Sequence, residues 1–139
     1  MIKKKIVTIV GAGVIGAGWA ARMLACGLIV NVYDPSVKAR KQLLSNTKTA
    51  LKSLQRWGLK KNAKLSKLKS YPDLRESLHS TTFVQENAPE NEKLKKKLLK
   101  DIDKLLPKNI IISSSSSGLL PTRIQSLCNY PERVCIGHP

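Results

Sequence analysis

The stretch Ile-Val-Thr-Ile-Val-Gly-Ala-Gly-Val-Ile-Gly-Ala-Gly, residues 6–18, decides how this chain folds. It starts as a mostly aliphatic run typical of a buried parallel strand, turns at glycines, and resumes as a helix. Its glycines have the spacing Gly-x-Gly-x-x-Gly, in which the first permits a tight turn, the second lets a pyrophosphate approach the backbone, and the third lets the helix pack on the strand. A helix that starts here points free N–H groups at that pyrophosphate. The residues expected to bind a dinucleotide in this turn are Gly11, Gly13, Val14, Ile15 and Gly16.

A second strand and an acidic residue follow the glycine turn, as a dinucleotide-binding unit requires. The helix predicted over Val14–Ala25 stops at Gly27, and the next apolar run, residues 28–33, leads to Asp34. An acid at the end of this strand accepts hydrogen bonds from the ribose hydroxyls. It also repels a ribose 2′-phosphate, since two like charges at about 4 Å cost roughly 4 kcal/mol at an effective dielectric near 20. Asp34 therefore predicts NAD rather than NADP as the cofactor.

The rest of the chain alternates between helical and strand patterns. Helices are expected over residues 36–54, 91–106 and 121–128, and strands over 81–85, 110–112 and 134–136. A shorter helix is expected over 59–68, so that residues from about 36 to 70 form a helical arm. This alternation predicts an α/β fold: a Rossmann-type doubly wound, mostly parallel sheet with helices on both faces, in one domain over residues 1–139.

Five consecutive serines, residues 113–117, precede Gly118. A serine run usually indicates low complexity and disorder. This run begins directly after a predicted interior strand, where α/β folds place ligand-binding loops, so we expect an ordered loop at the site. His79 precedes another expected strand and is interpreted as an exposed loop residue.

Composition limits the classes of protein to which the chain can belong. With 139 residues, 42% of them hydrophobic, it is long enough for one domain with a real core and too short for two ordinary domains. Its three cysteines have neither metal-ligand nor Cys-x-x-Cys spacing, which indicates no zinc site and no disulfide framework. No apolar stretch is long enough to span a membrane. We expect a cytoplasmic protein with no metal and no membrane partner.

The formal net charge of +16 makes a polyanion an alternative partner. The 25 basic residues comprise 19 Lys and 6 Arg, and only 4% of residues are aromatic. Base recognition depends on Arg, and strand binding depends on interleaved aromatic side chains. The lysines are therefore interpreted mainly as solvated helix faces, and no specific nucleic acid is expected as a partner.

Several motifs, in a fixed order, resemble one family. They are the glycine turn extended to Arg22, Tyr-Asp-Pro at 33–35, Val-Gln-Glu-Asn-Ala-Pro-Glu at 84–90, Ser-Ser-Gly-Leu at 116–119 and Gly-His-Pro at 137–139. This set resembles the NAD-binding domain of the 3-hydroxyacyl-CoA dehydrogenase family, and most of all its L-carnitine dehydrogenase branch.

The resemblance implies roles for four further residues. Glu90 and Lys95 would border the nicotinamide half of the cofactor. Ser117 would contact the cofactor and the substrate hydroxyl, and His138 would be the catalytic base. Imidazole suits this role, because oxidation of a secondary alcohol at neutral pH requires removal of the hydroxyl proton.

The sequence departs from the family pattern at three places. Ser115 lacks an amide that some relatives use near the nicotinamide. Ala50 and Trp57 fall where acyl-CoA enzymes use a polar and a basic residue toward CoA, which favours carnitine or another small hydroxy acid. The chain ends one residue after His138, without the family's C-terminal helical domain. We therefore expect a fragment with little turnover by itself, and a homodimer only when that domain is supplied.

Two classes of function stay open. The first is an NAD-dependent oxidoreductase that oxidises the 3-hydroxyl of L-carnitine or a related 3-hydroxy acid. Within this class, 3-hydroxyacyl-CoA, such as 3-hydroxybutyryl-CoA, is the alternative substrate. The second class has no catalysis: a nucleotide-binding remnant or a basic polyanion-binding protein.

Overall fold

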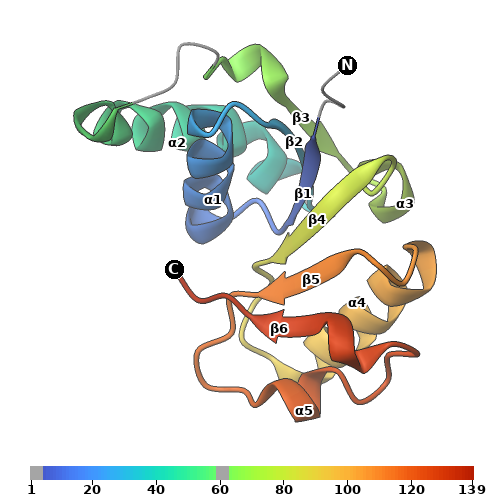
Figure 1. Ribbon diagram of the computed structural model, residues 1–139. Coiled ribbons are helices and arrows are strands. Elements are labelled where there is room, and N and C mark those ends of the chain that lie inside the picture. The colour runs from blue at the N-terminus through green and yellow to red at the C-terminus, as the bar shows by residue number, and fades with distance from the viewer. Residues whose placement is uncertain (1–4, 59–62) are drawn as a thin grey trace.

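One parallel sheet forms the centre of the molecule (Figure 1). The computed structural model describes residues 5–58 and 63–139, and in these residues the sheet has six strands in the order β3-β2-β1-β4-β5-β6. Their bounds are β1 Ile6–Val10, β2 Ile29–Tyr33, β3 Leu68–Tyr71, β4 Thr81–Glu86, β5 Ile111–Ser114 and β6 Val134–Ile136. Every neighbouring pair is parallel. This order and direction confirm the predicted Rossmann-type fold.

Helices connect the strands, and three of them begin at a capping side chain. The helices are α1 Val14–Ala25, α2 Val37–Leu54, α3 Leu74–Ser77, α4 Glu92–Leu105 and α5 Pro121–Ile124. Ser36, Asp73 and Asn91 accept hydrogen bonds from backbone N–H groups in the first turns of α2, α3 and α4. Such caps satisfy N–H groups that have no partner within the helix. Helix α1 begins without one.

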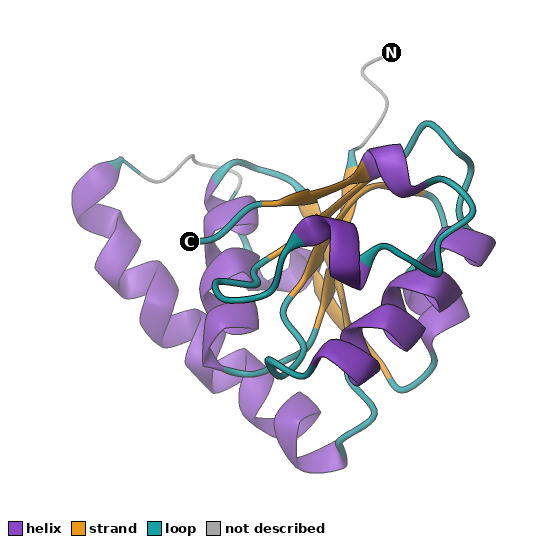
Figure 2. Ribbon diagram, turned by 90° about the horizontal axis from the view of Figure 1, so that it is seen from below, coloured by secondary structure: helices purple, strands orange, loops and turns teal. Residues whose placement is uncertain are grey.

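Two helical layers cover the two faces of the sheet (Figure 2). Helices α1 and α2 pack on one face, in a core that includes Ile9 and Leu24. Helices α3, α4 and α5 pack on the other face, in a core that includes Val10 and Leu99. Successive strand residues point to opposite faces, which is why Ile9 and Val10 lie in different cores. Because both faces are covered, β1 has aliphatic residues on both faces, and its one polar residue, Thr8, is buried and donates to Ser77 O.

The direction of winding changes beside β1, and this change sets the place of the site. From β1 the chain winds through β2 to β3, and it then crosses to β4 on the other side of β1 (Figure 1). The loops after β1 and β4 therefore diverge at the carboxyl edge of the sheet. In open α/β sheets, ligands bind in the crevice at such a point.

The segment before β3 differs from the prediction. Residues 59–62 of the expected helix lie outside the described residues, Leu65–Lys67 form a single 3-10 turn, and Leu68–Tyr71 are strand β3. This strand pairs with β2 at the edge of the sheet, with Tyr71 opposite Tyr33. A short edge strand with two exposed residues has no clear alternation, and its pairing overrides the helical preference of its lysine and leucine. The helical arm expected over about 36–70 therefore does not extend through β3.

A buried arginine fastens β6 to the end of α4. Arg133, 3% exposed, donates through Nε and Nη2 to Oδ1 of Asp103 at 2.9 and 2.7 Å. Its guanidinium also donates to main-chain carbonyls at the end of α4 and in the following turn. The last carbonyls of a helix have no partner within it, so Arg133 acts as a cap. This contact fixes the start of β6, and with it the segment that carries residues 137–139.

Candidate functional site

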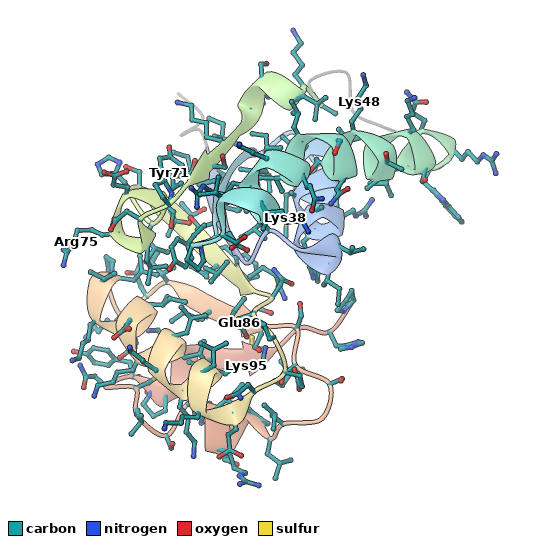
Figure 3. The ribbon with its side chains drawn as sticks, turned by 180° about the vertical axis from the view of Figure 1, so that it is seen from behind. Lys38, Lys48, Tyr71, Arg75, Glu86 and Lys95 are labelled. Atoms are coloured by element: carbon teal, nitrogen blue, oxygen red, sulfur yellow. The ribbon has the colours of Figure 1, made fainter. Side chains whose placement is uncertain are left out.

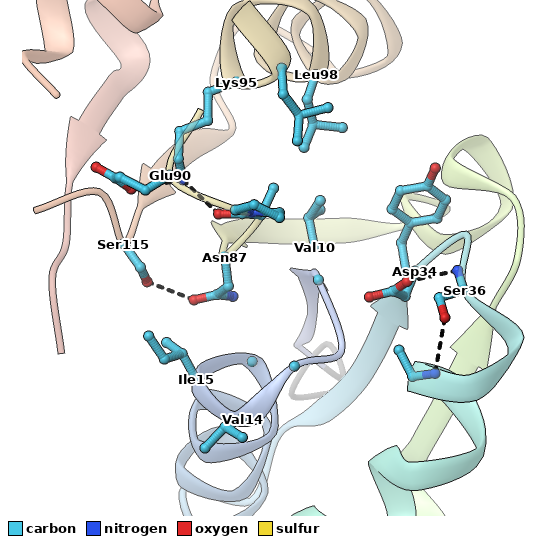
Figure 4. A pocket seen from close by; sticks show the side chains of 18 of the residues that line it. Val10, Val14, Ile15, Asp34, Ser36, Asn87, Glu90, Lys95, Leu98 and Ser115 are labelled. Atoms are coloured by element: carbon cyan, nitrogen blue, oxygen red, sulfur yellow. Dashed lines mark hydrogen bonds and ion pairs between the residues drawn. The ribbon is translucent and has the colours of Figure 1, made fainter. Parts of the chain in front are cut away.

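A cleft of about 730 Å³ opens between the glycine turn after β1 and the loops after β4, β5 and β6 (Figure 4). Every residue predicted to bind the cofactor or to act in catalysis lines it. They are Gly11, Gly13, Val14, Ile15, Gly16, Asp34, Glu90, Lys95, Ser117 and His138. The fold thus brings together residues from both ends of the chain.

The three glycines of the turn have three different surroundings. Gly11 has φ +102°, and a Cβ atom there would lie 2.8 Å from the carbonyl oxygen of Asn87. A Cβ atom on Gly16 would lie 1.9 Å from the carbonyl oxygen of Gly11. In the described part of the chain, no atom lies within 4 Å of the Cβ position of Gly13. Packing therefore requires Gly11 and Gly16, whereas the space beside Gly13 is open to a ligand.

Helix α1 presents its first turn to this open space. The helix has no acidic residue in that turn and no capping side chain. A hydrogen bond from Ala17 N to Gly13 O, at 2.9 Å, begins its internal ladder, so the preceding N–H groups are available to a ligand. Such groups donate to phosphate oxygens, and the helix dipole favours the negative charge. The turn therefore fits the pyrophosphate of NAD.

Asp34 lies at the end of β2 beside the glycine turn (Figure 4). Its carboxylate accepts hydrogen bonds from the N–H groups of Ala12 and Ser36, each at 2.8 Å. These contacts orient the carboxylate at the place where a dinucleotide's ribose hydroxyls are recognised. Burial, followed by the charges of Asp34 and Asp73, raises the pKa of the neighbouring Tyr33. The tyrosine therefore lines this end of the cleft as a neutral phenol at neutral pH.

A buried ion pair forms the opposite wall of the cleft. Lys95 and Glu86 are 1% and 0% exposed, and Nζ of Lys95 lies 2.9 and 3.0 Å from the two carboxylate oxygens (Figure 3). The ammonium group also donates to the carbonyl oxygen of Ala88 at 3.0 Å. An ammonium group has three N–H donors, so these contacts use all of them. Lys95 therefore holds the loop after β4 as well as lining the cleft.

Residues 113–118, here called the serine loop, are ordered as predicted. The first four serines are buried, and Ser117 is exposed to the cleft. Ser114 Oγ donates to the buried carboxylate of the ion pair at 2.5 Å, and Ser115 Oγ donates to Asn87 Oδ1 at 2.6 Å. Specific hydrogen bonds, rather than low complexity, therefore define this run.

Glu90 connects the ion pair to the serine loop. Its Oε1 accepts from Ser116 Oγ at 2.5 Å and from Gly118 N at 3.2 Å, and its Oε2 lies 3.6 Å from Lys95 Nζ. Partial burial acts to raise the pKa of Glu90. The hydrogen bonds from Ser116 and Gly118 and the charge of Lys95 outweigh it, and the pKa is lower than usual. Glu90 is therefore ionised at neutral pH.

His138 reaches the cleft from the segment after β6. The preceding Gly137 donates from its N–H to Ser114 O at 2.8 Å and accepts at its carbonyl oxygen from Gln85 Nε2 at 3.0 Å. The imidazole is exposed and lines the cleft together with Ser117. His79 is exposed, as predicted, and is not among the residues of the cleft.

The polar residues that support the cleft wall were not predicted from the sequence. Gln85 and Glu86 are 1% and 0% exposed, and both end an interior strand. A buried polar group needs a hydrogen-bonding partner. Two polar residues after the apolar centre of β4, Phe83 and Val84, were therefore a usable signal for a network at its carboxyl end. Their serine partners, Ser115 and Ser114, gave no such signal.

Within ranges 5–58 and 63–139, no group of three or more His, Cys, Asp or Glu side chains could hold a metal ion. No helix in those ranges is long and apolar enough to cross a membrane. Burial, followed by the charge of Asp103, raises the pKa of Cys128 to about 11, so its thiol is not a nucleophile near neutral pH.

Comparison with known proteins agrees with the fold and the glycine turn. Residues 6–139 match the family described as 3-hydroxyacyl-CoA dehydrogenase, NAD binding domain. L-carnitine dehydrogenase from Burkholderia mallei is 44% identical over 130 residues, an alignment that covers 94% of this chain and 40% of that protein. L-carnitine dehydrogenase from Oceanobacillus iheyensis is 38% identical over 135 residues, which cover 97% of this chain and 44% of that protein.

A solved structure of a dehydrogenase is also similar to this chain. (S)-3-hydroxybutyryl-CoA dehydrogenase from Ralstonia eutropha has a TM-score of 0.84 and 31% sequence identity, over 98% of this chain and 49% of that one. The chain therefore spans less than half the length of these relatives. The match over nearly the whole chain, together with the cleft, confirms NAD as the cofactor. The chain belongs to the 3-hydroxyacyl-CoA dehydrogenase family of oxidoreductases, whose NAD-binding domain it contains.

Proposed function

We propose that this domain serves the oxidation of the 3-hydroxyl of L-carnitine, or of a related small 3-hydroxy acid, by NAD. The observation that carries the proposal is that Ser117 and His138 line the same cleft as the glycine turn and Asp34. With the adenosine end of the cofactor at Asp34, the nicotinamide end is expected at the serine loop. A hydroxyl group beside that end would have a base and a hydrogen-bonding partner within the same cleft.

The residues around the serine loop would have separate roles in this oxidation. NAD, when bound, supplies the acceptor for the hydride that leaves the carbinol carbon. His138 would take the hydroxyl proton on an imidazole nitrogen, as a general base suited to neutral pH. Ser117 would hold the same hydroxyl by a hydrogen bond. Glu90 would keep the loop in place through Ser116.

The choice of substrate is supported by the relatives and by one residue of α2. The two L-carnitine dehydrogenases are 44% and 38% identical to this chain, against 31% for the 3-hydroxybutyryl-CoA enzyme. Ala50, at the position where acyl-CoA enzymes are expected to use a polar residue toward CoA, packs against the α1/α2 core. It therefore offers no hydrogen bond to a CoA moiety.

The test is NAD reduction with L-carnitine and with 3-hydroxybutyryl-CoA. It uses the 139-residue chain and a chimera that adds the remaining part of the Burkholderia mallei relative. We expect turnover of L-carnitine in the chimera, and a loss of about 100-fold or more in kcat with His138→Ala. His79→Ala is the matched control and should leave kcat unchanged. Undiminished turnover in the His138→Ala chimera would remove His138 from the mechanism.

A second candidate, oxidation of a 3-hydroxyacyl-CoA, has one observation in its favour. Lys52, Ser53, Arg56 and Trp57 line a hollow of about 510 Å³ at the end of α2, and Trp57 is 81% exposed. Two cations beside an aromatic ring suit the phosphates and the base of a nucleotide. If this candidate is right, Lys52→Ala with Arg56→Ala should raise KM for 3-hydroxybutyryl-CoA in the chimera and leave KM for L-carnitine unchanged. Equal effects on both KM values, or none, would count against it.

A further inference from the structure

The side chain of Gln85 lies between the serine loop and the segment that carries His138. It is 1% exposed, near the end of β4. Its Nε2 donates to Ser115 Oγ at 2.8 Å and to the carbonyl oxygen of Gly137 at 3.0 Å. One amide group thus joins the loops after β5 and β6.

The hydrogen bonds of Ser115 leave the amide only one orientation. Ser115 Oγ donates to Asn87 Oδ1 at 2.6 Å (Figure 4) and accepts from Trp19 Nε1 at 3.1 Å as well as from Gln85. A hydroxyl has one hydrogen and two acceptor positions, so Ser115 is fully used. The Gly137 carbonyl can only accept. The NH₂ of Gln85, and not its oxygen, must therefore face both groups.

The peptide before His138 is held from both sides. Gly137 N donates to Ser114 O at 2.8 Å, opposite the contact of its carbonyl with Gln85. A Cβ atom on Gly137 would lie 2.1 Å from Ser113 Oγ, so the glycine lets this backbone lie directly against β5. The place of His138 is therefore coupled to the serine loop through hydrogen bonds and close packing.

We propose that Gln85 is a positioning residue that fixes the serine loop and the Gly137–His138 segment relative to each other. Its amide supplies one hydrogen to each, which neither a carboxylate nor a thioether can do. The consequence for catalysis rests on the proposed function, because the separation of Ser117 and His138 matters only when both act on one substrate. The positioning itself is a property of the chain and can be measured without turnover.

The experiment is NMR spectroscopy of the 139-residue chain and of Gln85→Glu and Gln85→Met variants. The sequence has two histidines, so His79 is an internal reference for the imidazole signals of His138. Asn31→Asp is the matched control, since Asn31 is also a buried strand amide, 5% exposed, whose Nδ2 donates to Ser77 O at 3.0 Å. If the buried carboxylate of Gln85→Glu prevents folding, Gln85→Met provides the same measurement without a charge.

Loss of the Gln85 contacts should shift the imidazole signals of His138 and reduce the backbone order of Gly137 and His138. Hydrogen exchange of Gly137 N–H should become about fivefold faster, the effect of one net hydrogen bond. The imidazole signals of His79 should not shift, and Asn31→Asp should shift the signals of neither histidine. His138 signals and exchange that are unchanged in the folded Gln85 variants, or moved equally by Asn31→Asp, would overturn the proposal. Positioning by Gln85 without dehydrogenase activity in the chimera would count only against the proposed function.

Discussion

The glycine turn and the serine loop face each other across one cleft, but they are built differently. The glycine turn, residues 11–16, uses backbone N–H groups, two close backbone approaches and the carboxylate of Asp34. The serine loop is supported by buried side chains: the Glu86–Lys95 ion pair and the hydrogen bonds of Gln85. The glycine turn can form because Gly11 and Gly16 have no Cβ atom. The serine-loop wall can form only when each buried polar side chain has its hydrogen-bonding or ionic partner.

This difference predicts which property each wall loses when one of its residues is substituted. A buried charge or amide costs free energy unless its partners are in place, so loss of one partner leaves the others unsatisfied. A glycine that packing does not require can gain a Cβ atom at little cost to folding. Damage to the serine-loop wall should therefore appear first as loss of stability, and damage at Gly13 should appear as loss of cofactor affinity.

The largest effect is expected for Lys95→Met. It leaves the Glu86 carboxylate buried without its counter-ion, which should lower the free energy of unfolding by about 3–5 kcal/mol. Urea unfolding measures this. Adding Glu86→Leu should recover part of the loss, because it removes the unpaired buried charge but leaves the Ser114 hydroxyl and the Ala88 N–H without their acceptor.

The neighbouring Lys96 is the control for this prediction. It pairs with Glu92 at 2.6 Å on the surface of α4, one turn apart, and both side chains are partly exposed. Such pairs contribute about 0.2–0.5 kcal/mol, so Lys96→Met should change stability by no more than that. Equal losses for Lys95→Met and Lys96→Met would mean that the ion pair with Glu86 is not what supports the wall.

The next largest effects are expected for two glycines of the same turn, and they differ: one substitution should affect stability and the other cofactor affinity. Gly16→Ala places a methyl group 1.9 Å from the Gly11 carbonyl oxygen, and the backbone must shift, at a cost of about 3 kcal/mol. Gly13→Ala meets no atom within 4 Å in the described residues and should cost below about 1 kcal/mol, mostly as a poorer helix cap. Its NADH affinity should nevertheless fall at least tenfold, because the methyl group occupies the space beside the first turn of α1. Thermal unfolding and NADH titration measure the two quantities. A Gly13→Ala variant that binds NADH normally would place the pyrophosphate elsewhere.

A moderate effect is expected for cofactor choice. Asp34→Ala removes hydrogen bonds between a charged acceptor and the ribose, worth about 1.5–3 kcal/mol, so NADH should bind roughly 10–100-fold more weakly. NADPH should lose less, because repulsion of its 2′-phosphate is removed at the same time. Asp34→Asn keeps the side-chain shape and an acceptor but not the charge, and it separates repulsion from hydrogen bonding. An NADH-to-NADPH preference that stays constant in both variants would exclude Asp34 as its source.

The same contrast explains which parts of the fold and of the site could be predicted from the sequence. Gly11, Gly16 and Asp34 are specified by local chemistry, and the spacing of these residue types is meaningful before any fold is known. The strand order then follows from the βαβ pattern, since parallel strands with short connections allow few arrangements. The cleft residues taken from the family pattern all line one cleft, because Glu90, Ser117 and His138 follow the carboxyl ends of strands and Lys95 lies in the first turn of the helix after β4.

Side-chain partnerships and edge pairing could not be predicted in the same way. The contacts of Gln85 with Ser115 and Gly137 join three strands and require the register of the sheet. Nothing in the spacing of Lys95 shows that its partner is Glu86, because five other lysines share its helix. Strand β3 was not predicted, because its pairing with β2 depends on a neighbour 38 residues away, at Val30 and Leu68, and not on its own pattern.

The smallest effect concerns Glu90 and pH. Its pKa in the folded chain lies below the ordinary 4.5, and a carboxyl group whose pKa is lowered on folding stabilises the fold above its unfolded pKa. That contribution is lost as the pH falls from about 4.5 through the folded pKa, because Glu90 is then protonated in the folded chain as well as in the unfolded chain. The Glu90 side chain is 41% exposed, so the effect should be small. Melting temperatures of the natural chain and of Glu90→Gln, measured from about pH 6 down to about pH 3, should differ at the upper end and converge at the lower end. Ser116→Ala, which removes the hydroxyl that donates to Glu90 Oε1, should show a smaller difference over the same range. A difference between the natural chain and Glu90→Gln that does not change with pH would assign the contribution of Glu90 to packing rather than to its charge.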